Sequence, residues 1–179
     1  MRAPLARGSA SAAVASAEFE ALVEPWVAEM YRLAAAVVGV ESAEDVTQDA
    51  LVDAWRGLRR LRDPSRVRPW LHSIVVHRAS KHLRALRSRP RLIAVQPDEV
   101  WHGSRAFPDP AVDVAQREML DRAFEGLPLE QRACVVLHYS LDIPVAEIAT
   151  TLGIPEGTVK SRIHAGIRHL RHQMNRDDL

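Results

Sequence analysis

The chain has 179 residues, which is long enough for one domain or two small ones. Hydrophobic residues make up 47% of it and aromatic residues only 5%, so the sequence predicts an all-α protein of packed helices. The net charge is only +1, and no apolar run approaches the roughly 20 residues of a membrane span, so we expect no membrane association. The single cysteine, Cys134, excludes a disulfide within the chain and favours a reducing, cytoplasmic location.

The N-terminal residues 1–17 are rich in Ser and Ala and are predicted to form a disordered tail. Residues 15–17 (Ala-Ser-Ala) resemble a signal-peptide cleavage site, but the segment before them is only weakly apolar, so a signal peptide is the lesser alternative. A first helix is expected from Glu18 to Val38, because apolar residues recur there at steps of three and four. Gly39 would end this helix.

A second helix is predicted to begin at Ser42, whose hydroxyl would cap it together with Asp45 three residues later. Its buried stripe would start at Val46, include Trp55 and end at Leu61. Acidic and amide side chains crowd its first turns, where they either suit the helix dipole or form an acidic docking face. These residues are Glu44, Asp45, Gln48, Asp49 and Asp53.

A turn at residues 63–65 (Asp-Pro-Ser) precedes a third predicted helix, which runs from about Arg66 to Arg87. Trp70 would belong to its buried stripe. Within residues 56–91, twelve Arg and Lys residues accompany a single acid. This basic block indicates either a polyanionic partner or a solvated helix face.

Four prolines interrupt residues 89–111, and the helical periodicity is lost there. We therefore predict a Pro-rich linker between a small helical domain at residues 18–88 and a second one at residues 112–175. Trp101 and Phe107 lie within this linker and are expected to dock on another surface.

The second domain ends in two predicted helices, at residues 145–152 and from Pro155 to about Gln173, joined by a tight turn. Gly153 would take the left-handed conformation that ends the first of them, and the small side chain of Ala149 would let the second pass close by. This spacing is typical of a helix-turn-helix, whose second helix enters the major groove of DNA. An ordinary helical hairpin with a glycine turn is the alternative.

Polar side chains of the second helix are left to point outward and suit DNA contact. Lys and Arg reach phosphates or guanine edges, and Ser and Thr hydroxyls bond to phosphates. The candidate DNA-binding residues are Thr158, Lys160, Ser161, Arg162, His164 and Arg168.

No pattern in the sequence indicates catalysis or cofactor binding, so neither an enzyme nor a cofactor is expected. A phosphate-binding glycine loop and a nucleophile elbow are both missing. His72, His77 and His82 are five residues apart and do not share a helical face. His169 and His172 lack a Cys or carboxylate that would complete a ligand set, so we expect no metal.

Two blocks of the chain resemble regions 2 and 4 of the bacterial extracytoplasmic-function (ECF) sigma factors, the small two-domain sigma factors of RNA polymerase. The first block comprises residues 43–55 (AEDVTQDALVDAW) and 68–74 (RPWLHSI). The second comprises residues 127–133 (LPLEQRA) and 153–163 (GIPEGTVKSRI). The resemblance implies a sigma factor that binds core RNA polymerase and directs promoter-specific initiation of transcription.

The resemblance also implies a role for each set of residues. The helix with Glu44, Asp45, Gln48, Asp49, Asp53 and Trp55 would bind the clamp helices of the largest polymerase subunit. The residues that recognise and open the −10 element would be Arg66, Arg68, Trp70, His77, Arg78, Lys81 and Arg84. The helix around Thr158 to His164 would recognise the −35 element, and an anti-sigma factor is an expected further partner.

Two positions depart from the family pattern, because many members carry Asn in place of His77 and Asp in place of Lys81. The −10 sequence preference is therefore not carried over to this chain. Two other functions stay open at this point. One is a helix-turn-helix regulator that binds DNA as a dimer without polymerase, although we find no dimerisation element. The other is an interaction protein that uses its acidic helix for docking.

Overall fold

The computed structural model describes residues 7–88, 120, 122–124 and 126–177, and this part of the chain forms helices and turns without any strand. The expected all-helical fold is therefore confirmed. The elements in chain order are α1 (Arg7–Val38), α2 (Val40–Gly57), the 3-10 turns η1 (Leu58–Arg60) and η2 (Pro64–Arg66), α3 (Val67–Ser88), α5 (Leu129–Val135), the π-helical turn η4 (Val136–Ser140), α6 (Val145–Leu152) and α7 (Glu156–Asp177).

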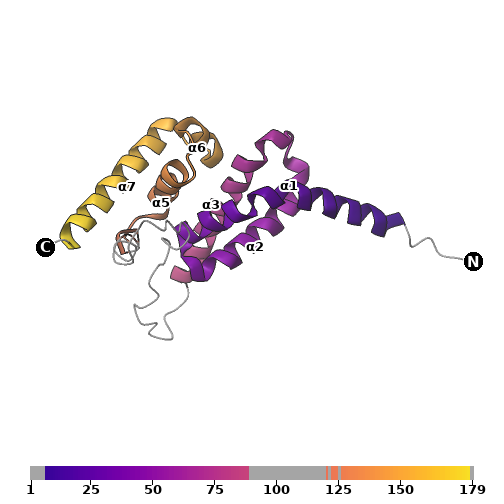
Figure 1. Ribbon diagram of the computed structural model, residues 1–179, viewed down its shortest axis with the longest axis horizontal. Helices are drawn as coiled ribbons and strands as arrows, with labels where there is room; N and C mark the ends of the chain where they lie inside the picture. Colours follow the sequence, from indigo (N-terminus) through magenta and orange to yellow (C-terminus); the bar gives the residue numbers. More distant parts are fainter. Residues whose placement is uncertain (1–6, 89–119, 121, 125, 178–179) are drawn as a thin grey trace, which may run out of the picture.

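The helices pack as two units, which lie against each other (Figure 1). The N-terminal unit consists of α1, α2 and α3, and the C-terminal unit consists of α5, η4, α6 and α7. In Figure 1, α5 lies between α7 and the N-terminal unit, and α1 extends beyond α2 at its beginning. No helix in the described part of the chain is long and apolar enough to cross a bilayer.

The first two helices begin earlier than the sequence patterns predict. Helix α1 starts at Arg7, so the expectation of a disordered tail over residues 1–17 is wrong from Arg7 onward. Ala, the residue with the highest helix propensity, recurs in that stretch and lets the helix continue. Helix α2 starts at Val40. Gly39, with a φ of 90°, occupies the N-cap position and has no side chain that could cap the helix. Ser42 therefore lies inside α2, and its predicted capping role is wrong.

The later helix boundaries agree more closely with the predictions. Asp63 caps the turn before α3, as expected, by accepting a hydrogen bond from the backbone N–H of Ser65 at 2.9 Å. Helix α6 spans the predicted residues, and Gly153 ends it in the left-handed conformation, with a φ of 64°. The predicted linker at 89–111, with Trp101 and Phe107, lies outside the described residues.

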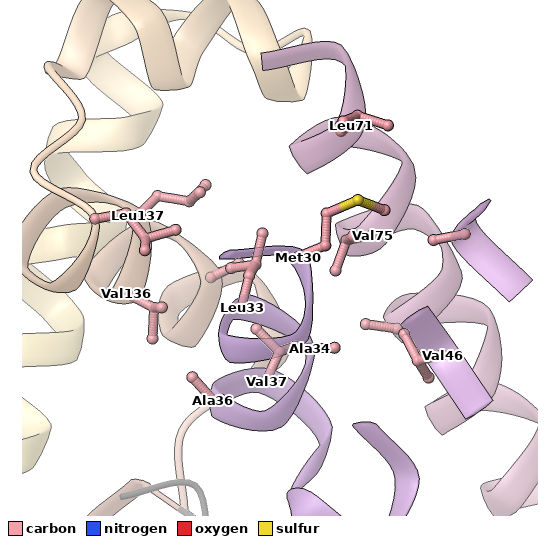
Figure 2. Close-up of a cluster of buried hydrophobic side chains, with 14 of the residues drawn as sticks. Met30, Leu33, Ala34, Ala36, Val37, Val46, Leu71, Val75, Val136 and Leu137 are labelled. Atoms are coloured by element: carbon pink, nitrogen blue, oxygen red, sulfur yellow. The ribbon is translucent and has the colours of Figure 1, made fainter. Parts of the chain in front are cut away.

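One hydrophobic core runs through both units, which the sequence did not predict. Met30, Leu33 and Val37 of α1 are fully buried; Leu33 lies toward Val136 and Leu137 of the C-terminal unit, and Met30 lies toward Leu71 and Val75 of α3 (Figure 2). On the other side of α1, the same core continues to α2 and α3 (Figure 2). Helix α1 is therefore the central element, because it packs on α2 and α3 of its own unit and also on the C-terminal unit.

Two arginines add polar links between the units. Arg132 of α5 is buried, and it donates hydrogen bonds to the carbonyl oxygens of Val37 (2.6 Å) and Leu127 (3.1 Å). Arg68 of α3 donates to the carbonyl oxygen of Leu141, just after η4, at 3.2 Å. The hydrogen bond from Arg132 to Val37 gives a donor to a carbonyl oxygen in the last turn of α1, which has no partner within the helix.

Gly153 gives a direct test of the helix-turn-helix corner. Replacing Gly153 by Ala should destabilise the protein by about 1–2 kcal/mol, because an L-residue is strained in the left-handed conformation. A Cβ atom there meets no neighbour within 4 Å, so the whole effect would be conformational. Chemical denaturation measures the change, with Gly157→Ala on α7 as the matched control, since that site is equally open and has no positive φ. A Gly153→Ala protein as stable as the control variant would contradict the assigned conformation.

Candidate functional site

The outer face of α2 carries the acidic residues that the sequence singled out. Glu44, Asp45, Gln48 and Asp49 are exposed, while Ala43, Val46, Ala50 and Ala54 are buried on the opposite face. Gln48 donates a hydrogen bond to Glu44 at 3.0 Å. We call Glu44, Asp45, Gln48 and Asp49 the acidic face.

Trp55 does not belong to the buried stripe of α2, contrary to the sequence prediction. Its side chain is 42% exposed and contacts Phe19 of α1 edge to face, with the ring centroids 5.1 Å apart. Val52 is 45% exposed on the same helix. The acidic face is thus followed along α2 by two exposed apolar side chains, and both apolar and charged contacts are available to a partner.

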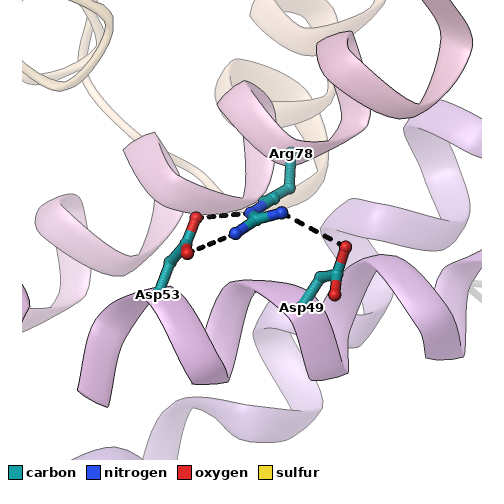
Figure 3. A network of polar contacts seen from close by, with 3 residues as sticks. All are labelled: Asp49, Asp53 and Arg78. Atoms are coloured by element: carbon teal, nitrogen blue, oxygen red, sulfur yellow. Dashed lines mark hydrogen bonds and ion pairs between the residues drawn. The ribbon is translucent and has the colours of Figure 1, made fainter. Parts of the chain in front are cut away.

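Asp53 and Asp49 are joined to α3 by a single guanidinium group. Arg78 donates from Nε and one terminal nitrogen to the two carboxylate oxygens of Asp53, and from its other terminal nitrogen to Asp49 at 3.3 Å (Figure 3). The hydrogen bond from Arg78 is the main cause that lowers the pKa of Asp53. Arg78, which was predicted to contact DNA, therefore binds Asp49 and Asp53, which were predicted to dock on a protein.

The other basic residues predicted on or beside α3 fall into two groups. Arg66, His77, Lys81 and Arg84 are exposed, and Arg84 also donates to the Ser80 hydroxyl at 2.9 Å. Arg68 instead lies half-buried against other elements. Besides its bond to Leu141, it pairs with Glu29 at 2.8 Å and lies over the Trp26 ring.

Sequence reasoning missed Glu29 and His72, which lie beneath Arg68. His72 is fully buried, and its Nε2 lies 2.8 Å from Glu29 Oε1. Burial lowers the pKa of His72, while the charge of Glu29 acts in the opposite direction. In the sequence, Glu29 lies between Trp26 and Met30 on the apolar stripe of α1, and an acid at such a position indicates a buried polar contact.

A cleft of about 340 Å³ lies between α2 and α3 beside Trp70. Gly57 forms part of its wall, and a Cβ atom at that position would come within 3.3 Å of the Trp70 ring. Arg56 and Arg60, two arginines not among the predicted site residues, also line it. The cleft combines an aromatic ring with cationic side chains, a combination that suits a planar base next to a phosphate.

The predicted DNA-binding residues of α7 do not all point the same way. Lys160, Ser161, His164 and Arg168 are exposed. Thr158 and Arg162 are half-buried, and Val159 and Ile163 belong to the core. The Ser161 hydroxyl donates to the carbonyl oxygen of Thr158 at 2.9 Å, and Lys160 lies 3.9 Å from Glu156.

Arg162 faces the N-terminal unit rather than open solvent. It lines a cleft of about 480 Å³ between the two units, together with His77 and Ser80 of α3. Burial raises the pKa of the neighbouring Cys134 thiol, and Arg162 acts against this rise. Cys134 is buried. The cleft therefore brings together His77, a candidate residue for the −10 element, and Arg162, a candidate residue for the −35 element.

A third cleft, of about 490 Å³, opens on the other side of α7. His164 and Arg168 line it together with Tyr139 and Arg171, two residues that were not predicted. Tyr139 is 63% exposed at the end of η4. The side chains on this side of α7 are basic and accessible. Among the described residues, no three His, Cys, Asp or Glu side chains gather into a metal site.

The chain matches two known sequence families. The family described as Sigma-70 region 2 matches residues 22–89, and the family described as Sigma-70, region 4 matches residues 117–170. The ECF RNA polymerase sigma factor SigL of Mycobacterium tuberculosis is 33% identical over 169 residues, which cover 93% of this chain and 94% of that protein. SigM of the same species is 36% identical over 122 residues, 68% of this chain and 59% of SigM.

Solved structures share the fold. The sigma factor RpoE of Bartonella quintana, in complex with the anti-sigma factor NepR, aligns with a TM-score of 0.68 at 20% identity, over 88% of this chain and 97% of that one. CnrH, in complex with the cytosolic domain of CnrY, aligns with a TM-score of 0.62 at 23% identity, over 93% of this chain and 95% of that one.

Proposed function

Because the chain belongs to the ECF family of RNA polymerase sigma factors and directs the polymerase to promoters, we propose which of its surfaces bind polymerase and which bind DNA. The N-terminal unit binds core RNA polymerase and the −10 element, and the C-terminal unit recognises the −35 element. The protein is an initiation factor and not an enzyme. The observation that carries this assignment is the separation of an acidic face on α2 from basic surfaces on α3 and α7.

The acidic face of α2 is the proposed docking surface for the clamp helices of the largest polymerase subunit. Its carboxylates are exposed and would meet a positively charged partner, which speeds encounter and fixes the orientation. Val52 and Trp55 add exposed apolar area next to it, and a buried aromatic anchor is a common source of binding energy in interfaces.

The basic residues at the start and on the outside of α3 are the proposed −10 surface. Arg66, Lys81 and Arg84 are placed to hold phosphates, and His77 is exposed beside them. The cleft at Trp70, with Arg56 and Arg60, is the proposed site for a base that has left the stack. With this assignment, Arg56 and Arg60 join the −10 residues that the family resemblance implied.

The proposed −35 surface is the exposed side of α7. Lys160, Ser161, His164 and Arg168 share this side, and Arg171 extends it by one turn. An α-helix fits the major groove, where such side chains reach base edges and phosphates. Arg162 contributes only if the two units move apart, since it lines the cleft between them, and Thr158 is half-buried.

The two units must separate before both promoter elements are recognised together. His77 and Arg162 line one cleft of about 480 Å³. The −10 and −35 positions lie about 25 base pairs apart, which corresponds to about 85 Å of B-form DNA. We propose that binding to polymerase supports the separated arrangement, in which Arg68 loses its bond to Leu141 and keeps its pairing with Glu29.

An anti-sigma factor is a further proposed partner. It is supported by the fold shared with the sigma factor RpoE, whose structure contains the anti-sigma factor NepR, and with CnrH, whose structure contains the cytosolic domain of CnrY. Co-purification from native cells before and after stress would identify such a partner.

Run-off transcription tests the proposed function. The purified chain and core polymerase are combined with a library of genomic promoter fragments, and promoter-dependent transcripts are expected only when both proteins are present. A chain that binds promoter DNA by itself but yields no transcript with core polymerase would instead support a stand-alone helix-turn-helix regulator.

Reversing one charge on the acidic face should weaken polymerase binding. We expect Asp45→Arg to lower the affinity for core polymerase about tenfold, because a like charge would then face the basic clamp helices. Fluorescence anisotropy with labelled chain measures the affinity. Glu24→Arg is the control, since Glu24 is an exposed acid on α1 outside the acidic face. Equal affinity of the Asp45→Arg and control proteins would place the docking surface elsewhere.

A further inference from the structure

We propose that Arg78 is a positioning residue that holds the −10 surface of α3 against α2, and that it does not contact promoter phosphates. This inference rests on the proposed function of the N-terminal unit. It changes the role that the family resemblance implied for Arg78, and also the docking role of Asp53.

The guanidinium group of Arg78 makes its contacts within the protein. All three of its nitrogen atoms donate to carboxylates, two to Asp53 and one to Asp49 (Figure 3). Its side chain is only 16% exposed, and that of Asp53 is 30% exposed. Two-point pairing of an arginine with a carboxylate is directional as well as strong, so it fixes the relative position of the two helices.

The spacing of these residues along both helices supports this role. Asp49 and Asp53 are four residues apart and share a face of α2. Trp70, Ile74 and Arg78 follow one another at steps of four on α3, so they share a face as well. The ion pair therefore lies on the same side of α3 as the aromatic ring of the proposed base site.

Asp53 and Ile74 each border two clefts, the one beside Trp70 and the one that contains His77. The Arg78–Asp53 pair thus stands at the boundary between two sites proposed to contact the −10 element. Loss of the pair would let α2 and α3 shift and would change the shape of both clefts. A phosphate contact, by contrast, would leave the clefts unchanged and would add the same binding energy for every sequence.

Salt dependence distinguishes the two roles. Each phosphate contact contributes about 0.7–0.9 to the slope of log affinity against log salt concentration, depending on whether the DNA is single- or double-stranded. We would measure this slope for the complete holoenzyme on a promoter found by run-off transcription, with Arg78→Gln and with Lys81→Gln. Lys81 is exposed on α3 three residues further along and is the matched control.

The expected result has three parts. Lys81→Gln lowers the slope by about 0.7–0.9 and weakens binding to all sequences, whereas Arg78→Gln leaves the slope unchanged. Arg78→Gln reduces the preference for the cognate −10 sequence over single-base variants about tenfold. Asp53→Asn has the same effect as Arg78→Gln, and the double variant is no worse than either single one, because all three remove the same interaction.

Other outcomes overturn the inference. A slope that falls by about 0.7–0.9 in Arg78→Gln would show a phosphate contact, and additive effects of Arg78→Gln and Asp53→Asn would show separate roles. If Arg78→Gln does not fold, the Asp53→Arg/Arg78→Asp exchange replaces it. That exchange should restore −10 selectivity if pairing is the function of Arg78, and failure to restore it contradicts the proposal. Failure of the unaltered holoenzyme to bind promoters would instead contradict the proposed function itself.

Discussion

Replacing Leu137 by Ala should lower the free energy of unfolding by about 2–5 kcal/mol, the usual cost of a cavity in a packed core. Leu137 is fully buried in η4, where it meets Leu33 and Val37 of α1 (Figure 2). The same α1 side chains belong to the core that continues to α2 and α3. We therefore expect the cavity to destabilise both units, although Leu137 belongs to only one of them.

Two spectroscopic probes test this shared response. Trp26, Trp55 and Trp70 all lie in the N-terminal unit, so tryptophan fluorescence in a Trp101→Phe background reports on that unit, while circular dichroism reports on all helices. In urea both midpoints should shift equally in Leu137→Ala. Val52→Ala is the control, because Val52 is 45% exposed and surface changes usually stay within about 0.5 kcal/mol. An unchanged fluorescence midpoint in Leu137→Ala would mean that the two units unfold separately.

Replacing Arg132 by Met should cost about 3 kcal/mol and loosen the contact between the units. Hydrogen bonds from a charged donor contribute about 1.5–3 kcal/mol each, and the carbonyl oxygens of Val37 and Leu127 would both lose one. Met keeps much of the length of the side chain but cannot donate. The chain should then populate the separated arrangement that promoter recognition requires.

Small-angle scattering measures the separation as a larger radius of gyration for Arg132→Met than for the unaltered chain. Affinity for promoter DNA without polymerase should rise in the same variant, since the cleft that holds His77 and Arg162 would open. Arg59→Met is the control, because Arg59 is exposed in η1. An Arg132→Met protein with an unchanged radius and normal stability would show that Arg132 does not hold the units together.

Local sequence patterns predicted the elements whose structure depends on near neighbours. The end of α6 at Gly153 and the Asp63 cap before α3 were predicted correctly, because each follows from the chemistry of one turn. The start of α2 was predicted wrongly at Ser42, because Gly39 allows a corner so tight that the helix starts at the next residue. Trp55 was misplaced because its position on α2 falls at the edge of the buried stripe, next to Phe19.

The contacts that define the site join residues far apart in the chain, and no periodicity reports on them. Arg78 and Asp53 are 25 residues apart, and the family resemblance implied a different partner for each of them. The resemblance likewise assigned Arg68 to DNA contact, although it reaches a carbonyl 73 residues away. The family resemblance grouped these residues into surfaces, which stay predictions, and the pairing between the groups required the three-dimensional arrangement.

The hydrogen bond from Arg132 to Val37 spans 95 residues, and this separation has a consequence for the order of events during synthesis. Helices α1, α2 and α3 are contiguous in the chain, so their mutual contacts form as soon as they leave the ribosome. Arg132 is translated later, and at about 5–20 residues per second the Val37 carbonyl stays accessible to solvent for several seconds. During that interval the nascent N-terminal unit exposes the apolar α1 surface that the C-terminal unit later covers.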